Sequence, residues 1–213
     1  MATELEGGTM STQHFARVGA ACGIVFPVAM FLAVGDGNHF APWRAVVATW
    51  ALVLALPFFG YLYRVLRGAD ASDAWLSTAA LVAGVTGITL KLASHAPELA
   101  LHRDHIAKGT ELYKVIDDIA GAATLTSLYP LAICSAAIAA VVLRERILPR
   151  WLGIFAAVTA IALAVNAGFL YASFVPALLL FLLWTLVAGV VLLRRAWRAE
   201  PRQVAGTEAA VGA

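Results

Sequence analysis

The sequence predicts an all-α protein that forms a six-span transmembrane helix bundle. Hydrophobic residues make up 62% of the chain and charged residues only 13%, whereas a typical soluble domain carries about 25% charged residues. Six long apolar runs also follow one another with short polar gaps between them. A run of about 20 such residues makes a helix long enough to cross the ~30 Å hydrocarbon layer of a bilayer.

The spans can be placed from the apolar runs and the charges between them. We expect them near Arg17–Val34, Arg44–Tyr63, Asp73–Ser94, Thr110–Leu143, Trp151–Ser173 and Phe174–Leu193. The fourth is too long for one crossing, so about two turns at its start should stand outside the hydrocarbon. Residues 1–16 are expected to be a flexible N-terminal segment, 17–198 a single bundle, and 199–213 a disordered tail of small and polar residues.

Basic residues indicate how the bundle is oriented. Cytoplasmic loops of membrane proteins carry an excess of lysine and arginine. Ten basic residues lie on the side of the termini and five on the other side. The first group is Arg17, Arg64, Arg67, Arg144, Arg146, Arg150, Arg194, Arg195, Arg198 and Arg202, and the second is Arg44, Lys91, Arg103, Lys108 and Lys114. Both termini are therefore predicted to be cytoplasmic.

The longest outer link, residues 97–108 between spans three and four, is predicted to form a short helix of its own. Pro97 suits the first position of a helix, Glu98 its positive end and Lys108 its negative end, and Gly109 favours a stop. At 100° per residue, Glu98, His102 and His105 share an arc of about 60°.

This outer side is the best candidate for a site. Imidazole nitrogens and a carboxylate at this spacing suit a divalent metal such as zinc. The further ligands that could complete such a site are His39, His95, Asp36, Asp117 and Asp118. The alternative is an interfacial helix whose histidines are hydrogen-bonded or solvated.

Lys91 is a second candidate, because an ionisable residue within a span is often functional. It lies 16 residues after Trp75, about 24 Å along a helix, just inside the outer edge of the hydrocarbon. We predict that it pairs with Asp117 or Asp118, which begin the fourth span at similar depth. In the alternative, its stem extends outward so that the amine reaches water.

Small residues and net charge bear on partners. Gly19 and Gly23 are spaced for close helix contact, which we assign to packing within the bundle, with a homodimer or another membrane protein as the alternative. A formal net charge of +2, dispersed along the chain, gives no basis for nucleic-acid binding. The partner that the composition requires is the lipid bilayer.

The stretch from Leu143 to Gly153, LRERILPRWLG, resembles uncharacterised multi-pass membrane proteins of actinobacteria, in which an arginine-rich loop and an L-P-R-W-L-G segment precede an alanine-rich span. The use of twelve arginines against three lysines fits such a source. The resemblance covers the last three spans and implies a bacterial plasma-membrane location. Because such proteins have no assigned activity, it implies no catalytic residue.

Three function classes follow from these residues. The first is a non-enzymatic module that binds a small cation, a proton or a lipid-like ligand at its outer face. The second is a metal-dependent membrane hydrolase that acts on a lipid ester or amide through a zinc-bound water. The third is a structural or accessory subunit without a site. A serine-nucleophile motif, a P-loop or a dinucleotide loop does not occur in a supporting context, which makes the enzyme the less favoured class.

Overall fold

The protein is a bundle of long helices. A computed structural model describes residues 4–34, 42–68, 74–103, 106–107, 109–169 and 175–198. In these ranges the elements are α1 (Glu4–Val34), α2 (Pro42–Arg67), α3 (Trp75–Arg103), α4 (Glu111–Glu145), α5 (Arg150–Phe169) and α6 (Val175–Arg198). All six are long and apolar enough to cross a membrane, as the sequence predicts. Helices suit that environment because each satisfies its own backbone hydrogen bonds.

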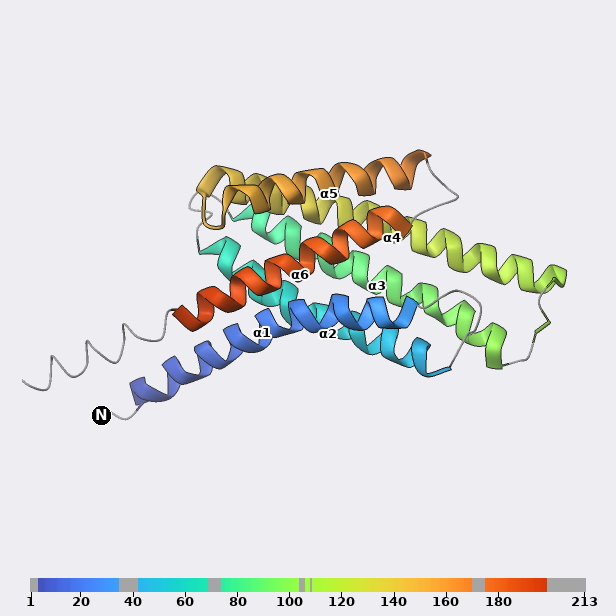
Figure 1. The fold of residues 1–213 in the computed structure, drawn as a ribbon, viewed down its shortest axis with the longest axis horizontal. Coiled ribbons are helices and arrows are strands. Elements are labelled where there is room, and N and C mark those ends of the chain that lie inside the picture. Colours follow the sequence, from blue (N-terminus) through green and yellow to red (C-terminus); the bar gives the residue numbers. More distant parts are fainter. Residues whose placement is uncertain are drawn as a thin grey trace, which may run out of the picture.

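The helices run up and down along one long axis (Figure 1). Each packs against the next helix in the sequence, and α6 closes the arrangement by packing against α1. The start of α1 and the end of α6 lie at the same end of the bundle (Figure 1), which we call the terminal end. At the opposite end, α3 and α4 extend past the other four helices (Figure 1).

The extension of α4 follows from its length. Its 35 residues span about 52 Å, against a hydrocarbon layer of ~30 Å. Thr110 caps its first turn by accepting a hydrogen bond from the Tyr113 backbone N–H at 3.2 Å. The helix is therefore one continuous element, with its first turns beyond the ends of α1, α2, α5 and α6 (Figure 1).

Aromatic side chains fill the middle of the bundle. Trp184 is fully buried and stacks on Phe181, with 6.4 Å between the ring centroids. Its indole Nε1–H donates to the Leu152 carbonyl of α5 at 3.2 Å. Phe58 and Phe59 of α2 form a similar buried pair. By contrast, many valine, leucine and isoleucine side chains remain exposed along the outer faces, as expected of a surface that faces acyl chains.

Glycines mark the close helix contacts. A Cβ on Gly19 would meet Tyr61, and one on Gly23 would meet Phe58, both on α2. A Cβ on Gly189 of α6 would meet the Gly23 backbone itself. The prediction that Gly19 and Gly23 serve packing within the bundle is thus confirmed.

Two helix boundaries differ from expectation. The separate outer helix at 97–108 is wrong, because α3 continues without a break to Arg103 and contains Pro97. A proline at a helix start and one inside a helix look alike in sequence, and the packing of α3 on α4, which buries Leu101, decides here. The N-terminal segment that we expected to be flexible is helical from Glu4. Extending an existing helix avoids the cost of nucleating one.

Candidate functional site

A polar cluster lies between α3 and α4, inside the apolar part of the bundle. It consists of Lys91, Ser94 and His95 on α3 and Thr124 on α4, and we call it the polar cluster. The exposed fractions of these residues are 9%, 0%, 7% and 2%, respectively. Lys91 is about 24 Å from the start of α3, so the cluster lies near the level at which the hydrocarbon would end on the side away from the termini.

Three of these side chains form a closed network of hydrogen bonds. The Lys91 ammonium donates to Thr124 Oγ1 at 3.0 Å and to Ser94 Oγ at 3.3 Å. The Thr124 hydroxyl donates to Ser94 Oγ at 3.2 Å, and the Ser94 hydroxyl donates to the Lys91 carbonyl at 2.7 Å. Because the amine bonds to α4 and is buried, Lys91 does not extend to water in the way that the alternative from sequence required.

His95 follows Lys91 by four residues, which places the two side chains on the same face of α3. Its Nδ1 atom is buried and has no hydrogen-bond partner in the structure as described. Such an atom is unusual, because buried polar groups are nearly always paired. The polar cluster therefore includes a buried ring nitrogen that is open to a proton or to a ligand group.

Glycine packing sets which residues face each other across α3 and α4. Cβ atoms on Gly84 and Gly87 would contact Cys134 and Leu131 of α4. The same antiparallel register brings Ser94 opposite Thr124. These glycines let the two backbones approach closely. A short hydroxyl-bearing side chain on one helix can therefore reach a hydroxyl group on the other.

The register also explains what Lys91 contacts in place of the predicted aspartates. It places Asp117 and Asp118 opposite the last turn of α3, about 15 Å beyond Lys91 along the axis. Both aspartates are exposed on α4. Among the described residues, no ion pair joins Lys91 to either of them, whereas its bonds to Ser94 and Thr124 are present.

The predicted metal ligands fall mainly outside what the structure describes. His39 and His105 lie outside the described residues, as does Asp36. Glu98 and His102 belong to α3, but their side chains are not described. Within the described ranges, no three His, Cys, Asp or Glu side chains are grouped closely enough to hold a metal ion. His95, Asp117 and Asp118 thus form no metal site by themselves.

Ser94 and Thr124 are the residues that reading the sequence did not single out. A weak signal was available, because Ser94 lies three residues from Lys91 and so on the same helix face. Thr124 gave no such signal, since it is 33 residues from Lys91 along the chain and serine and threonine are common in apolar spans.

Searches of protein families, of curated proteins and of solved structures each found no match to this chain. They do not bear on the resemblance to actinobacterial membrane proteins. Function must therefore be argued from the polar cluster.

Proposed function

We propose that this multi-pass membrane protein is a non-enzymatic module that binds the anionic headgroup of a lipid-like ligand at the polar cluster. The observation that carries the proposal is the buried Lys91 ammonium, held by the Ser94 and Thr124 hydroxyls within a membrane-spanning helix. Ionisable residues at such depth are costly to bury and usually mark a ligand or ion path.

The chemistry of the cluster favours an anion over a metal cation. An ammonium has three N–H donors and no acceptor, and its positive charge repels a second cation at this range. A carboxylate or phosphate supplies a negative charge and hydrogen-bond acceptors, both of which suit an ammonium group.

The position of the cluster favours an amphiphile. It lies near the level where hydrocarbon gives way to headgroups, so a bound lipid could keep its chain beside the apolar faces of α3 and α4. Lys91 and His95 each retain a small exposed fraction, and they share one face of α3. We take that face to be the side from which a headgroup reaches the cluster.

Binding of single-chain amphiphiles to the purified protein tests the proposal. Oleate and oleyl phosphate distinguish a carboxylate from a phosphate ligand, and oleyl alcohol is the uncharged control. Retention of each, measured by native mass spectrometry, should be higher for an anion than for the alcohol. Lys91→Met should abolish that preference. Lys114→Met, which removes an exposed lysine at the same end of α4, should leave it intact.

Equal retention of all three probes by the unaltered protein would rule out the anion site. An unchanged preference in Lys91→Met would do the same, provided that this variant elutes as a folded particle in detergent. The accessory-subunit hypothesis would then be the one to keep. The metal-dependent hydrolase, most of whose predicted ligands lie outside the described side chains, stays an alternative from the sequence.

A further inference from the structure

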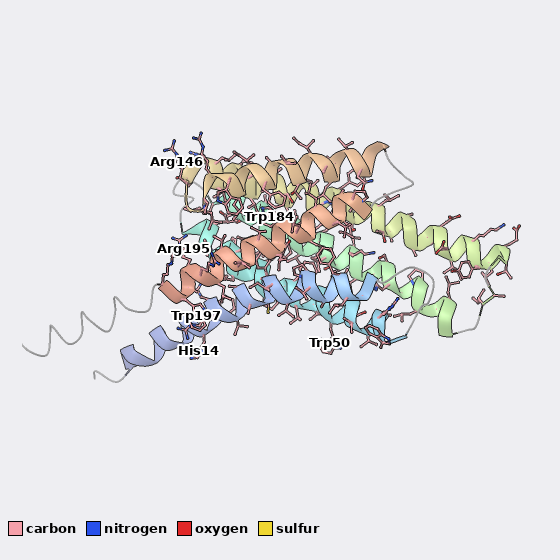
Figure 2. All side chains as sticks on the ribbon, in the orientation of Figure 1. His14, Trp50, Arg146, Trp184, Arg195 and Trp197 are labelled. Carbon is pink, nitrogen blue, oxygen red and sulfur yellow. The ribbon has the colours of Figure 1, made fainter. Side chains whose placement is uncertain are left out.

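The terminal end of the bundle carries a concentrated positive face. Exposed arginines project from two neighbouring segments, the turn between α4 and α5 and the end of α6. They are Arg146, Arg150, Arg194 and Arg198, and we call this set the arginine face. Figure 2 shows Arg146 and Arg195 at the same end of the bundle.

The turn between α4 and α5 is held firmly. Arg146 has a left-handed backbone with φ of 54°, and its N–H donates to the Val142 carbonyl at 3.0 Å, which ends α4. Leu148 is buried beneath the turn. The Leu152 N–H donates to the Pro149 carbonyl at 2.9 Å, which starts α5. The arginines on either side of Leu148 are thus presented on a fixed backbone.

Contacts between elements join this turn to the rest of the end. The Arg195 guanidinium donates to the Ile147 carbonyl at 2.9 Å and so ties α6 to the turn. The Arg17 guanidinium lies 5.3 Å from the centre of the Trp197 ring and ties α1 to α6. Arg195 and Arg17 thus stabilise the terminal end, while the four arginines of the arginine face remain exposed at its surface.

Acidic residues are few among the described side chains of these two segments. Among the described side chains of the two segments, Glu145 is the only acid, and Arg144 pairs with it at 3.2 Å. Exposed Trp151 and Trp197 flank the arginines. Tryptophan beside arginine is typical of the level of lipid headgroups.

We infer that the arginine face binds the phosphate groups of acidic phospholipids in the leaflet at the terminal end. A basic surface at the headgroup level attracts anionic lipids, and each arginine near that surface strengthens binding about fivefold. Guanidinium groups also match phosphate geometry through paired N–H donors. The inference does not depend on the polar cluster, which lies near the other end.

Competition between phosphatidylglycerol and phosphatidylcholine tests the inference on the purified full chain carrying Lys91→Met, so that the ammonium of the polar cluster does not contribute to the result. Native mass spectrometry should show preferential retention of phosphatidylglycerol. Arg146→Gln/Arg150→Gln should weaken that retention roughly twenty-five-fold, because two arginines are removed. Arg44→Gln/Lys114→Gln removes as many charges near the opposite end and should change it little. Arg146→Lys/Arg150→Lys keeps the charge and should retain most of the preference.

Salt provides a second test on the same Lys91→Met chain. Interactions between exposed charges are screened strongly at about 1 M salt, so the preference for phosphatidylglycerol should disappear there. The inference is overturned if the Lys91→Met chain shows no preference at low salt, if its preference survives high salt, or if both glutamine variants lose it equally.

Discussion

Replacing Gly189 with alanine should destabilise the bundle, although alanine is the better helix former. Gly189 lies where α6 crosses α1. A Cβ there would stand 2.8 Å from the Gly23 carbonyl carbon, 3.0 Å from the Gly23 oxygen and 3.1 Å from Ile24 Cγ1. Two of these atoms belong to the backbone of α1, so they cannot rotate away, and the two helices must separate.

The size of the effect follows from two opposing terms. Forcing a methyl group into a well-packed contact costs about 1–3 kcal/mol. Alanine in place of glycine within a helix returns roughly 0.5–1 kcal/mol. The balance is a loss on the order of 1 kcal/mol in the free energy of unfolding, which is a large part of the stability of an ordinary protein.

Unfolding by sodium dodecyl sulfate from a mild detergent, followed by tryptophan fluorescence, measures this change. Gly60→Ala is the matched control, because a Cβ on Gly60 meets no atom within 4 Å. That variant should be as stable as the unaltered protein or more stable by up to about 1 kcal/mol. If Gly189→Ala proved equally stable, the close approach of α1 and α6 would have to be rejected.

Three further predictions concern buried bonds and topology. In the same unfolding assay, Thr124→Val should lower the free energy of unfolding by roughly 0.6 kcal/mol, a usual value for a hydrogen bond between membrane helices. Thr126→Val is the control and should have a smaller effect, because the exposed Thr126 hydroxyl bonds only within α4. Trp184→Phe should lower the free energy of unfolding by about 1 kcal/mol, because the Leu152 carbonyl loses its buried hydrogen-bond donor. Trp50→Phe, at an exposed position, should leave stability unchanged. Equal losses in the two variants would argue against the buried hydrogen bond. A reporter fused to the C-terminus should be active only in the cytoplasm, since the terminal end carries the excess of arginine, and activity outside the cell would reverse the proposed orientation.

The parts of the fold that can be predicted are those that depend on the nearest residues. Span number and approximate placement follow from apolar run length, and the start of α4 at Glu111 follows the expected boundary at Thr110 closely. Pro97 shows where local patterns fail, because its effect depends on whether a neighbouring helix supports the turn around it. In α3 the packing on α4 continues past Pro97, and so does the helix.

The candidate site shows the same division. Lys91 can be selected from sequence, because a charge within an apolar run is rare and costly. Its partners cannot be selected in that way. Asp117 and Asp118 have the opposite charge, and counting residues along the spans places them at a matching depth. The hydrogen bonds of Lys91 nevertheless go to the neutral side chains of Ser94 and Thr124.

By itself, the sequence determined that this chain forms helices long enough to cross a membrane, because apolar length and the need to satisfy backbone hydrogen bonds leave few other structures in lipid. It also determined that arginines collect beside the two termini. Only the tertiary structure decided which residues of different helices meet. Gly84 and Gly87 pack against Cys134 and Leu131, and that contact fixes the register of α3 on α4. The register then brings a lysine and a threonine that are 33 residues apart into one buried cluster. That contact depends on how two helices pack, and the residues next to each of them in the sequence do not reveal it.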